Sequence, residues 1–164
     1  MSEEQCGRCW NSEYHGTAQE ARRTAKDALK VVLDDGAKMT RAHPADAGLD
    51  LYSRETITLF PGMSYKFDTG VHVAIPEGYA GFVMSKSGLN VNHGLTSDGV
   101  IDSGYTGSIV VKLYNHGRNP VLIEQGMKIS QLVLVPIITP FLLMVDSLEE
   151  TERGDGGFGS TGKF

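Results

Sequence analysis

Residues 56–84 read TITLFPGMSYKFDTGVHVAIPEGYAGFVM, four short apolar runs with turn residues between them. Short apolar runs cut by Gly, Pro, Asp and Asn are typical of the strands of an all-β fold. The separators include Pro61-Gly62 and Pro76-Glu77-Gly78, residue types that favour tight turns. This stretch therefore predicts four consecutive strands, at 56–60, 64–68, 71–75 and 79–84.

Short apolar runs separated by turn residues continue on both sides of this stretch. Further strands are predicted at 31–33, 49–53, 107–115, 120–124 and 128–137. Many short strands at intervals of eight to twelve residues indicate an all-β sandwich or barrel. The two longest runs, around Val110 and Leu134, are apolar on both faces, so we expect them to be buried, with another subunit as one candidate cover.

Length and composition limit the classes of protein that fit. The chain has 164 residues, 40% of them hydrophobic and 21% charged, which suits one domain with a proper core. A formal net charge of −5 argues against a general nucleic-acid binder. We expect no membrane contact and a cytoplasmic location, because no run approaches ~18 apolar residues and the charged first thirty residues lack a signal core.

The N-terminal residues 1–28 are predicted to be an extension. TAQEARRTAKDALKVV, residues 17–32, places Ala and Leu at helical spacing and predicts a short helix, either weakly docked or bound to a protein partner. Cys6 and Cys9 form a CGRC pair without a second pair to complete a zinc site. They are expected to be ordinary reduced thiols, and a zinc ion shared between chains of an oligomer is the alternative.

Two interior segments contain polar residues that a β-fold does not need. Asp50 lies inside the strand-like LDLY of DAGLDL (46–51), where Asp is disfavoured, so it either serves a site or satisfies turn amides. In MSKSGLNVNHG (84–94), a strand ends in Ser-Lys-Ser-Gly before a short helical stretch. Free amides, hydroxyls and one ammonium make this a candidate anion site.

Two more segments have the same character. In DGVIDSGYTG (98–107), glycines are expected to bend the backbone at both ends, and Asp102 is expected to lie beside apolar walls as a candidate general base. Tyr105 could present its ring to a sugar or a base. In EQGMKISQLVL (124–134), Gln131 interrupts an apolar strand and needs a partner if it is buried.

The glycine-rich end RGDGGFGSTG, residues 153–162, buries little and loses much backbone entropy on ordering. Its guanidinium, aromatic ring and two hydroxyls are not a linker composition. We therefore expect a ligand to order it.

Taken in order, AGLDL, SKSGL, GVIDSGYTG, GMKISQL and RGDGGFGSTG resemble the five motifs of the trimeric dUTPase family, over roughly residues 30–164. The resemblance implies a jelly-roll-like β-domain over 29–152 and a flexible lid over 153–164. It also implies hydrolysis of dUTP to dUMP and pyrophosphate, which lowers dUTP and supplies dUMP for thymidylate synthesis. Further implications are a homotrimer with shared active sites and Mg²⁺ held by the substrate phosphates.

The resemblance also implies a role for each motif residue. Asp102 would activate the attacking water, Tyr105 would exclude a 2′-hydroxyl, and backbone groups at Gly99, Val100 and Ile101 would bind uracil. The phosphates would be bound by Lys86, Ser87, Gly88 and Gln131, with Ser87 next to the bridging oxygen. Asp50, together with Asp46, would reach the metal through water. The lid residues would be Phe158, which stacks on uracil, and Arg153, Gly159, Ser160 and Thr161, which approach the phosphates.

Three departures from the family pattern stand out. Lys86 replaces the usual arginine, the segment NHGLTSDG (92–99) is short, and Gly104 stands where many relatives have a second acid.

A dCTP deaminase or bifunctional enzyme on the same fold is one alternative function, but that chemistry needs a glutamate and residues 94–110 contain none. A nucleotide-sensing regulatory protein, whose extension contacts a partner, is the other.

Overall fold

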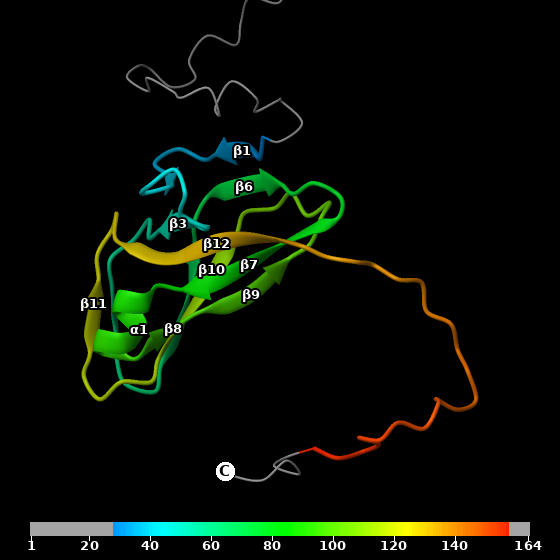
Figure 1. Ribbon diagram of the computed structural model, residues 1–164. Coiled ribbons are helices and arrows are strands. Elements are labelled where there is room, and N and C mark those ends of the chain that lie inside the picture. Colours follow the sequence, from blue (N-terminus) through cyan, green and yellow to red (C-terminus); the bar gives the residue numbers. More distant parts are fainter. Residues whose placement is uncertain (1–27, 158–164) are drawn as a thin grey trace, which may run out of the picture.

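The computed structural model describes residues 28–157 of the chain. These residues fold into an all-β domain with one short helix (Figure 1). The strands are β1 (Lys30–Leu33), β2 (Met39–Thr40), β3 (Gly48–Tyr52), β4 (Ile57–Leu59), β5 (Ser64–Asp68), β6 (Val71–Ala74), β7 (Tyr79–Ser85), β8 (Leu95–Thr96), β9 (Asp98–Ile101), β10 (Val110–Asn115), β11 (Val121–Ile123) and β12 (Lys128–Pro136). The helix α1 spans Ser87–His93. The predicted all-β class is confirmed.

The strands form small antiparallel sheets around one core. The largest has the order β2-β3-β12-β7-β9, and β5-β10-β8, β1-β6 and β11-β4 complete the enclosure. Side chains from every strand except β1, β2 and β9 meet in a continuous buried cluster, and Met39 of β2 and Ile101 of β9 pack against it. Phe67, fully buried, packs edge-to-face on Tyr65 with ring centroids 4.9 Å apart. The long pairing of β12 with β3 and β7 fixes the elements that carry the site.

All nine predicted strands are present, and β5 has the predicted bounds. Three strands were missed: β2, β8 and β9. In β9, Asp98 and Gly99 are poor strand formers, and the strand exists because it pairs with β7 from Met84 to Gly81.

Two expectations about packing and local structure need correction. Residues 30–32, the end of the predicted helix, belong to strand β1, and the rest of that helix and the Cys6–Cys9 pair lie outside the described residues. Within one chain the run around Val110 is buried on one face only, because β10 alternates: Val111 is fully buried and Val110 is 48% exposed. Near Leu134, Val135 and Ile137 are each 37% exposed.

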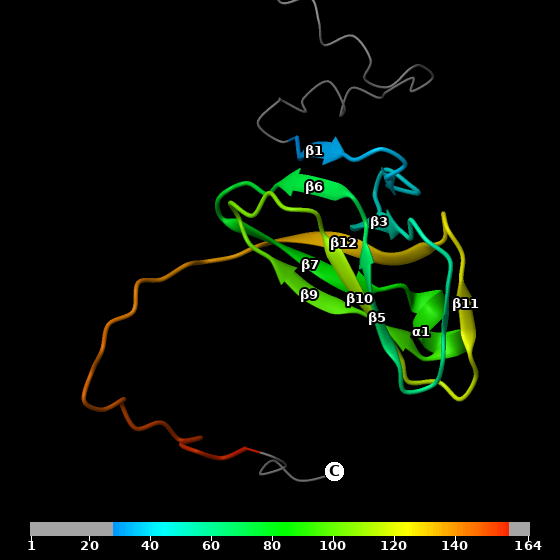
Figure 2. The same ribbon diagram turned by 180° about the vertical axis from the view of Figure 1, so that it is seen from behind.

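Beyond β12 the chain leaves the barrel as an extended arm, drawn orange to red in Figures 1 and 2. The arm carries large apolar side chains that are almost fully exposed in the single chain: Ile138, Phe141, Leu142 and Met144 are 85–90% exposed. Within residues 28–157, α1 does not qualify as a membrane-crossing helix by length or apolarity, and no other helix is present.

Candidate active site

The first, second and fourth motifs meet on three adjacent strands. In the register of the sheet, Gln131 of β12 lies opposite Asp50 of β3 on one side and Met84 of β7 on the other. The second motif follows directly from β7. Segments that are 36 to 81 residues apart in the chain are therefore neighbours. We call their four polar residues the polar cluster: Asp50, Lys86, Lys128 and Gln131.

Asp50 is the centre of the polar cluster and is only 3% exposed. Its Oδ1 lies 2.6 Å from Lys86 Nζ and its Oδ2 lies 2.6 Å from Lys128 Nζ. Burial by itself raises the pKa of this carboxyl, but the hydrogen bonds from Lys128 and Lys86 and their charges outweigh it, so the pKa lies below its ordinary value. The partners of the unusual strand aspartate are two lysines rather than turn amides.

Lys128 was not predicted as a site residue from the sequence, although it lies in the fourth motif three residues before Gln131. Its hydrogen bond to Asp50 raises the pKa of its ammonium, so the group is charged at neutral pH. Two ammoniums around one carboxylate leave a local charge of +1. Such a surplus next to partly exposed lysine ends suits an anion.

Gln131 has the partner that its position required. It is half-buried, and its Nε2 donates to the backbone oxygen of Ser85 at 3.2 Å. The side chain lies across Gly48, where a Cβ atom would stand 2.9 Å from Gln131 Cδ and closer still to Oε1. Gly48 is therefore a site residue that sequence reasoning missed, and the only signal for it was the Ala-Gly pair beside Asp50.

The predicted helical stretch after the second motif is confirmed as α1. It begins after Lys86 and ends at Gly94, which has φ 68° in the left-handed region that favours glycine. Ser87 and Gly88 form its exposed first turn. The first internal backbone bond is donated by Asn90 to Lys86, so the preceding amides lie free of the helix ladder.

The third motif contains β9 and the turn that follows it. In the described part of the chain β9 pairs only with β7, so its outer edge presents backbone groups at Gly99 and Val100. Contrary to expectation, Gly99 is regular strand and does not bend the chain; the turn comes at Gly104, with φ 90°. Asp102 is exposed on this turn rather than enclosed by apolar walls.

Tyr105 lies back over the turn. Its hydroxyl donates to the backbone oxygen of Ser108 at 3.0 Å, and a Cβ on Gly107 would stand 2.7 Å from Tyr105 Cζ. The side chain is 46% exposed. The turn therefore exposes both the carboxylate of Asp102 and an aromatic ring.

The two halves of the site are separated within one chain. Ile101 lies opposite Gly81 and Asp98 lies opposite Met84, so the end of β9 points away from Lys86. From Gly81 to Ser85 is four residues, or about 13 Å of strand. The structure thus brings the first, second and fourth motifs together and holds Asp102 at the other end of β7.

The two predicted metal-facing carboxylates have different surroundings. Asp46 is partly exposed; its carboxylate accepts a hydrogen bond from the backbone N–H of His43 at 3.0 Å and lies 3.1 Å from His43 Nδ1. Asp50 holds two ammoniums. Across residues 28–157, no group of three or more His, Cys, Asp or Glu side chains is arranged to hold a metal ion.

The lid motif begins on the arm. Arg153 is exposed, and its Nε donates to the backbone oxygen of Gly156 at 3.0 Å, so the structure does not bring it to either half of the site of its own chain. The remaining predicted lid residues, Phe158, Gly159, Ser160 and Thr161, lie outside the described residues.

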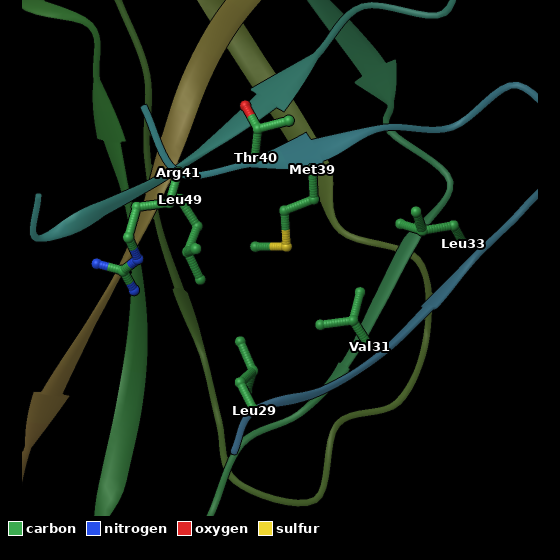
Figure 3. A pocket seen from close by; sticks show the side chains of 7 residues that line it. All are labelled: Leu29, Val31, Leu33, Met39, Thr40, Arg41 and Leu49. Carbon is green, nitrogen blue, oxygen red and sulfur yellow. The ribbon is translucent and has the colours of Figure 1, made fainter. Parts of the chain in front are cut away.

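One hollow of about 460 Å³ lies away from these groups, beside β1. Figure 3 shows Leu29 and Val31 facing Met39 and Leu49 across it. Its lining is mostly apolar, which does not suit a triphosphate.

Comparison with known proteins bears directly on the identity of this fold and site. The dUTPase family matches residues 34–162. The deoxyuridine 5′-triphosphate nucleotidohydrolase of Cutibacterium acnes is 49% identical over 125 residues, which cover 74% of this chain and 82% of that protein. The corresponding protein of Clostridium tetani is 40% identical over 138 residues, with coverage of 82% and 95%.

Solved structures similar to this chain are also dUTPases. The dUTPase of Staphylococcus bacteriophage 80α with dUpNHpp has a TM-score of 0.77 and 35% identity, covering 83% of this chain and 99% of the phage chain. A variant dUTPase of S. aureus phage φ11, described with a structural Mg(II) ion, has a TM-score of 0.69 and 32% identity, with coverage of 75% and 99%. The chain is an all-β protein of the dUTPase fold, and it belongs to the dUTPase family.

Proposed function

We propose that this protein hydrolyses dUTP to dUMP and pyrophosphate. The observation that carries the proposal is the polar cluster: three family motifs converge on one carboxylate and two ammoniums, beside the free amides at the start of α1. Family membership and the names of the relatives support the same reaction.

In the proposed reaction, Asp102 accepts a proton from a water molecule while the water oxygen attacks the α-phosphorus. The bond from the α-phosphorus to the α–β bridging oxygen breaks, and pyrophosphate leaves with that electron pair. Lys86, with Ser87 and Gly88, would stabilise the negative charge that develops on the bridging oxygen and the leaving group. Gln131 would orient the phosphate chain.

Base and sugar selection is assigned to the third motif. The free outer edge of β9 at Gly99, Val100 and Ile101 offers backbone donors and acceptors for the uracil edge, and a wrong base would leave such groups unpaired. The ring of Tyr105 would pack on the deoxyribose and leave no room for a 2′-hydroxyl.

We further propose a homotrimer in which chains share active sites. A general base and a phosphate-binding serine must act on one α-phosphate, yet about 13 Å of strand separates their anchor points in one chain. Asp102 of one chain would therefore serve the polar cluster of a neighbour. The exposed apolar arm, with Ile138 and Phe141, would pack on another chain and deliver Arg153, Phe158, Gly159, Ser160 and Thr161 over its nucleotide.

The triphosphate offers a divalent ion better ligands than the described protein residues do. Asp50 is already neutralised by two lysines and Asp46 lies apart on its own partners, so these residues do not make a direct Mg²⁺ site. Mg²⁺ would be carried by the triphosphate, where it offsets phosphate charge. The cytoplasmic location stays a prediction.

The test is pyrophosphate release by purified protein with Mg²⁺, with dUTP, dTTP, dCTP and UTP offered separately. The expected result is turnover of dUTP alone. An Asp102→Asn chain, which keeps the turn and loses the base, is the control for a contaminating phosphatase. Turnover of dCTP would point to the deaminase-like relatives or to relaxed base recognition, and no turnover of any nucleotide would contradict the proposal.

A regulatory role is a second candidate. The phage 80α dUTPases that resemble this chain are described as controlling transfer of virulence genes by a G protein-like mechanism. A partner of residues 1–28 would be the corresponding feature here. A pull-down that compares the full chain with residues 29–164 tests this: a partner captured only by the full chain supports it, and equal profiles contradict it.

A further inference from the structure

The turn that carries Asp102 and Tyr105 is attached to the end of β5, to β6 and to the residue that follows β6. We call residues 102–108 the catalytic loop. Ser103 Oγ donates to the backbone oxygen of Ile75 at 3.2 Å, and Ser108 Oγ donates to the carboxylate of Asp68. A third contact joins an imidazole, that of His72, to the backbone oxygen of Thr106.

His72 connects three segments of the chain. Its Nδ1 lies 2.9 Å from the oxygen of Thr106, and its Nε2 lies 3.2 Å from Asp34 Oδ1, in the turn between β1 and β2. Both partners can only accept, so both ring nitrogens need a proton to satisfy them. The doubly protonated imidazolium makes both hydrogen bonds, whereas the neutral ring makes one.

The charged groups around His72 favour that form. Asp34 contacts it directly, and Asp68 at the end of β5 adds a second negative charge. Arg54, 3.5 Å from Asp34, opposes them, and Lys30 lies along the same groove beside β1. The hydrogen bond to Thr106 raises the pKa of His72, burial lowers it, and Asp34 raises it, with a net rise.

We propose that His72 is a positioning residue, which fastens the catalytic loop at Thr106 to the β1–β2 turn at Asp34. Thr106 adjoins Tyr105, whose hydroxyl bond to Ser108 closes the same loop. A shift at Thr106 therefore moves the ring of Tyr105 and the backbone next to Asp102. The inference rests on the proposed function only for its effect on turnover, since the fastening itself is a property of the fold.

Two near-isosteric variants separate the two contacts. His72→Asn keeps a donor near the position of Nδ1 and retains the Thr106 contact, and His72→Gln keeps one near Nε2 and retains the Asp34 contact. At pH 6.5 we expect His72→Asn to keep dUTP turnover within about twofold of the parent, and His72→Gln to lose about tenfold in kcat, because small misplacements of reacting groups are costly. His116→Asn, an exposed imidazole stacked on Tyr114, is the matched control.

Amide hydrogen exchange of residues 103–107 gives a readout besides activity. In the parent chain the protection factors should fall as the pH rises through the pKa of His72, because the neutral ring shares one proton between its nitrogens and the Nε2–H tautomer loses the bond to Thr106. In His72→Asn, which does not titrate, they should stay constant, and in His72→Gln they should be low throughout. Urea unfolding of both variants checks that each chain is folded.

Equal behaviour of His72→Asn and His72→Gln, or protection in the parent that ignores pH, would overturn the inference. The two proposals fail separately. A parent chain that shows the pH-dependent protection and hydrolyses no dUTP contradicts the proposed function and leaves the positioning role of His72 intact.

Discussion

The polar cluster and the catalytic loop differ in how they are built. Asp50 is 3% exposed and is held by two ion pairs, to Lys128 on the adjacent strand β12 and to Lys86 just after β7, whereas Asp102 is exposed on a turn fastened mainly through backbone oxygens. The cluster is complete within one chain, and the loop projects to the far end of β7. We infer that the cluster contributes to stability and substrate binding, and that the loop contributes mainly to the chemical step.

The largest effect should come from the loop. Asp102→Asn removes the proposed base and leaves the turn geometry in place, so kcat should fall by about 10² to 10⁴-fold with little change in dUpNHpp binding or unfolding free energy. Pyrophosphate release and calorimetric titration measure the two quantities. Near-normal turnover would show that Asp102 is not the general base. It would also contradict the inference that the catalytic loop contributes mainly to the chemical step.

The second effect tests the arm. A chain that ends at Glu152 should keep the barrel and its oligomeric state and lose about 10²-fold in kcat/KM, because the groups that would position the nucleotide are gone. Light scattering and steady-state kinetics follow the two properties. A chain that ends at Gly162 is the matched control and should be fully active. Unchanged hydrolysis by the shorter chain would refute the lid.

Much of the barrel could be predicted because alternation along a strand is a local property. Segments such as SYKFD carry their own pattern, and β5 has the expected bounds. Strand β9 could not be predicted, since its Asp98 and Gly99 favour turns and its strand state depends on pairing with β7. The exposure of Asp102 could not be predicted either, because it depends on how the turn after β9 packs on the rest of the fold.

The site was predictable as residues but not as contacts. Asp50 and Gln131 stood out as polar residues inside strands, but the register that brings Lys86 and Lys128 to one carboxylate is a long-range property. Gly48 gave only the weak signal of the Ala-Gly pair beside Asp50, and His72 gave none, because a histidine in a strand looks ordinary in sequence. Motif resemblance supplied the roles that local patterns could not.

A smaller effect tests whether the polar cluster is a stability element. Asp50→Asn leaves two ammoniums without their counter-charge, and it should lower the free energy of unfolding at pH 7 by about 1 to 3 kcal/mol, less than for a fully buried pair because the lysine ends reach water. Urea unfolding measures it, and Asp46→Asn, at a partly exposed carboxylate, should change it by less than about 0.5 kcal/mol.

The pH dependence of the same difference has a definite sign. The pKa of Asp50 is lowered by folding, so its contribution is present above the unfolded value, about 3.9, and is lost as pH falls through the lower folded value. The gap between the parent chain and Asp50→Asn should therefore persist at pH 5 and close only in stronger acid. A gap that closes between pH 7 and 5 would contradict the assignment to Asp50.

The smallest effect distinguishes binding from stability inside the cluster. Gly48→Ala places a methyl group against the flexible end of Gln131, which can move aside, so the unfolding free energy should change little. The displaced amide would no longer reach the phosphates, and KM for dUTP should rise about fivefold, or about 1 kcal/mol of binding. Because both changes act through one side chain, Gly48→Ala combined with Gln131→Ala should be no worse than Gln131→Ala alone. Additive rises in KM would show that Gly48 acts through a contact other than the one with Gln131. They would also show that moving the Gln131 amide does not weaken substrate binding.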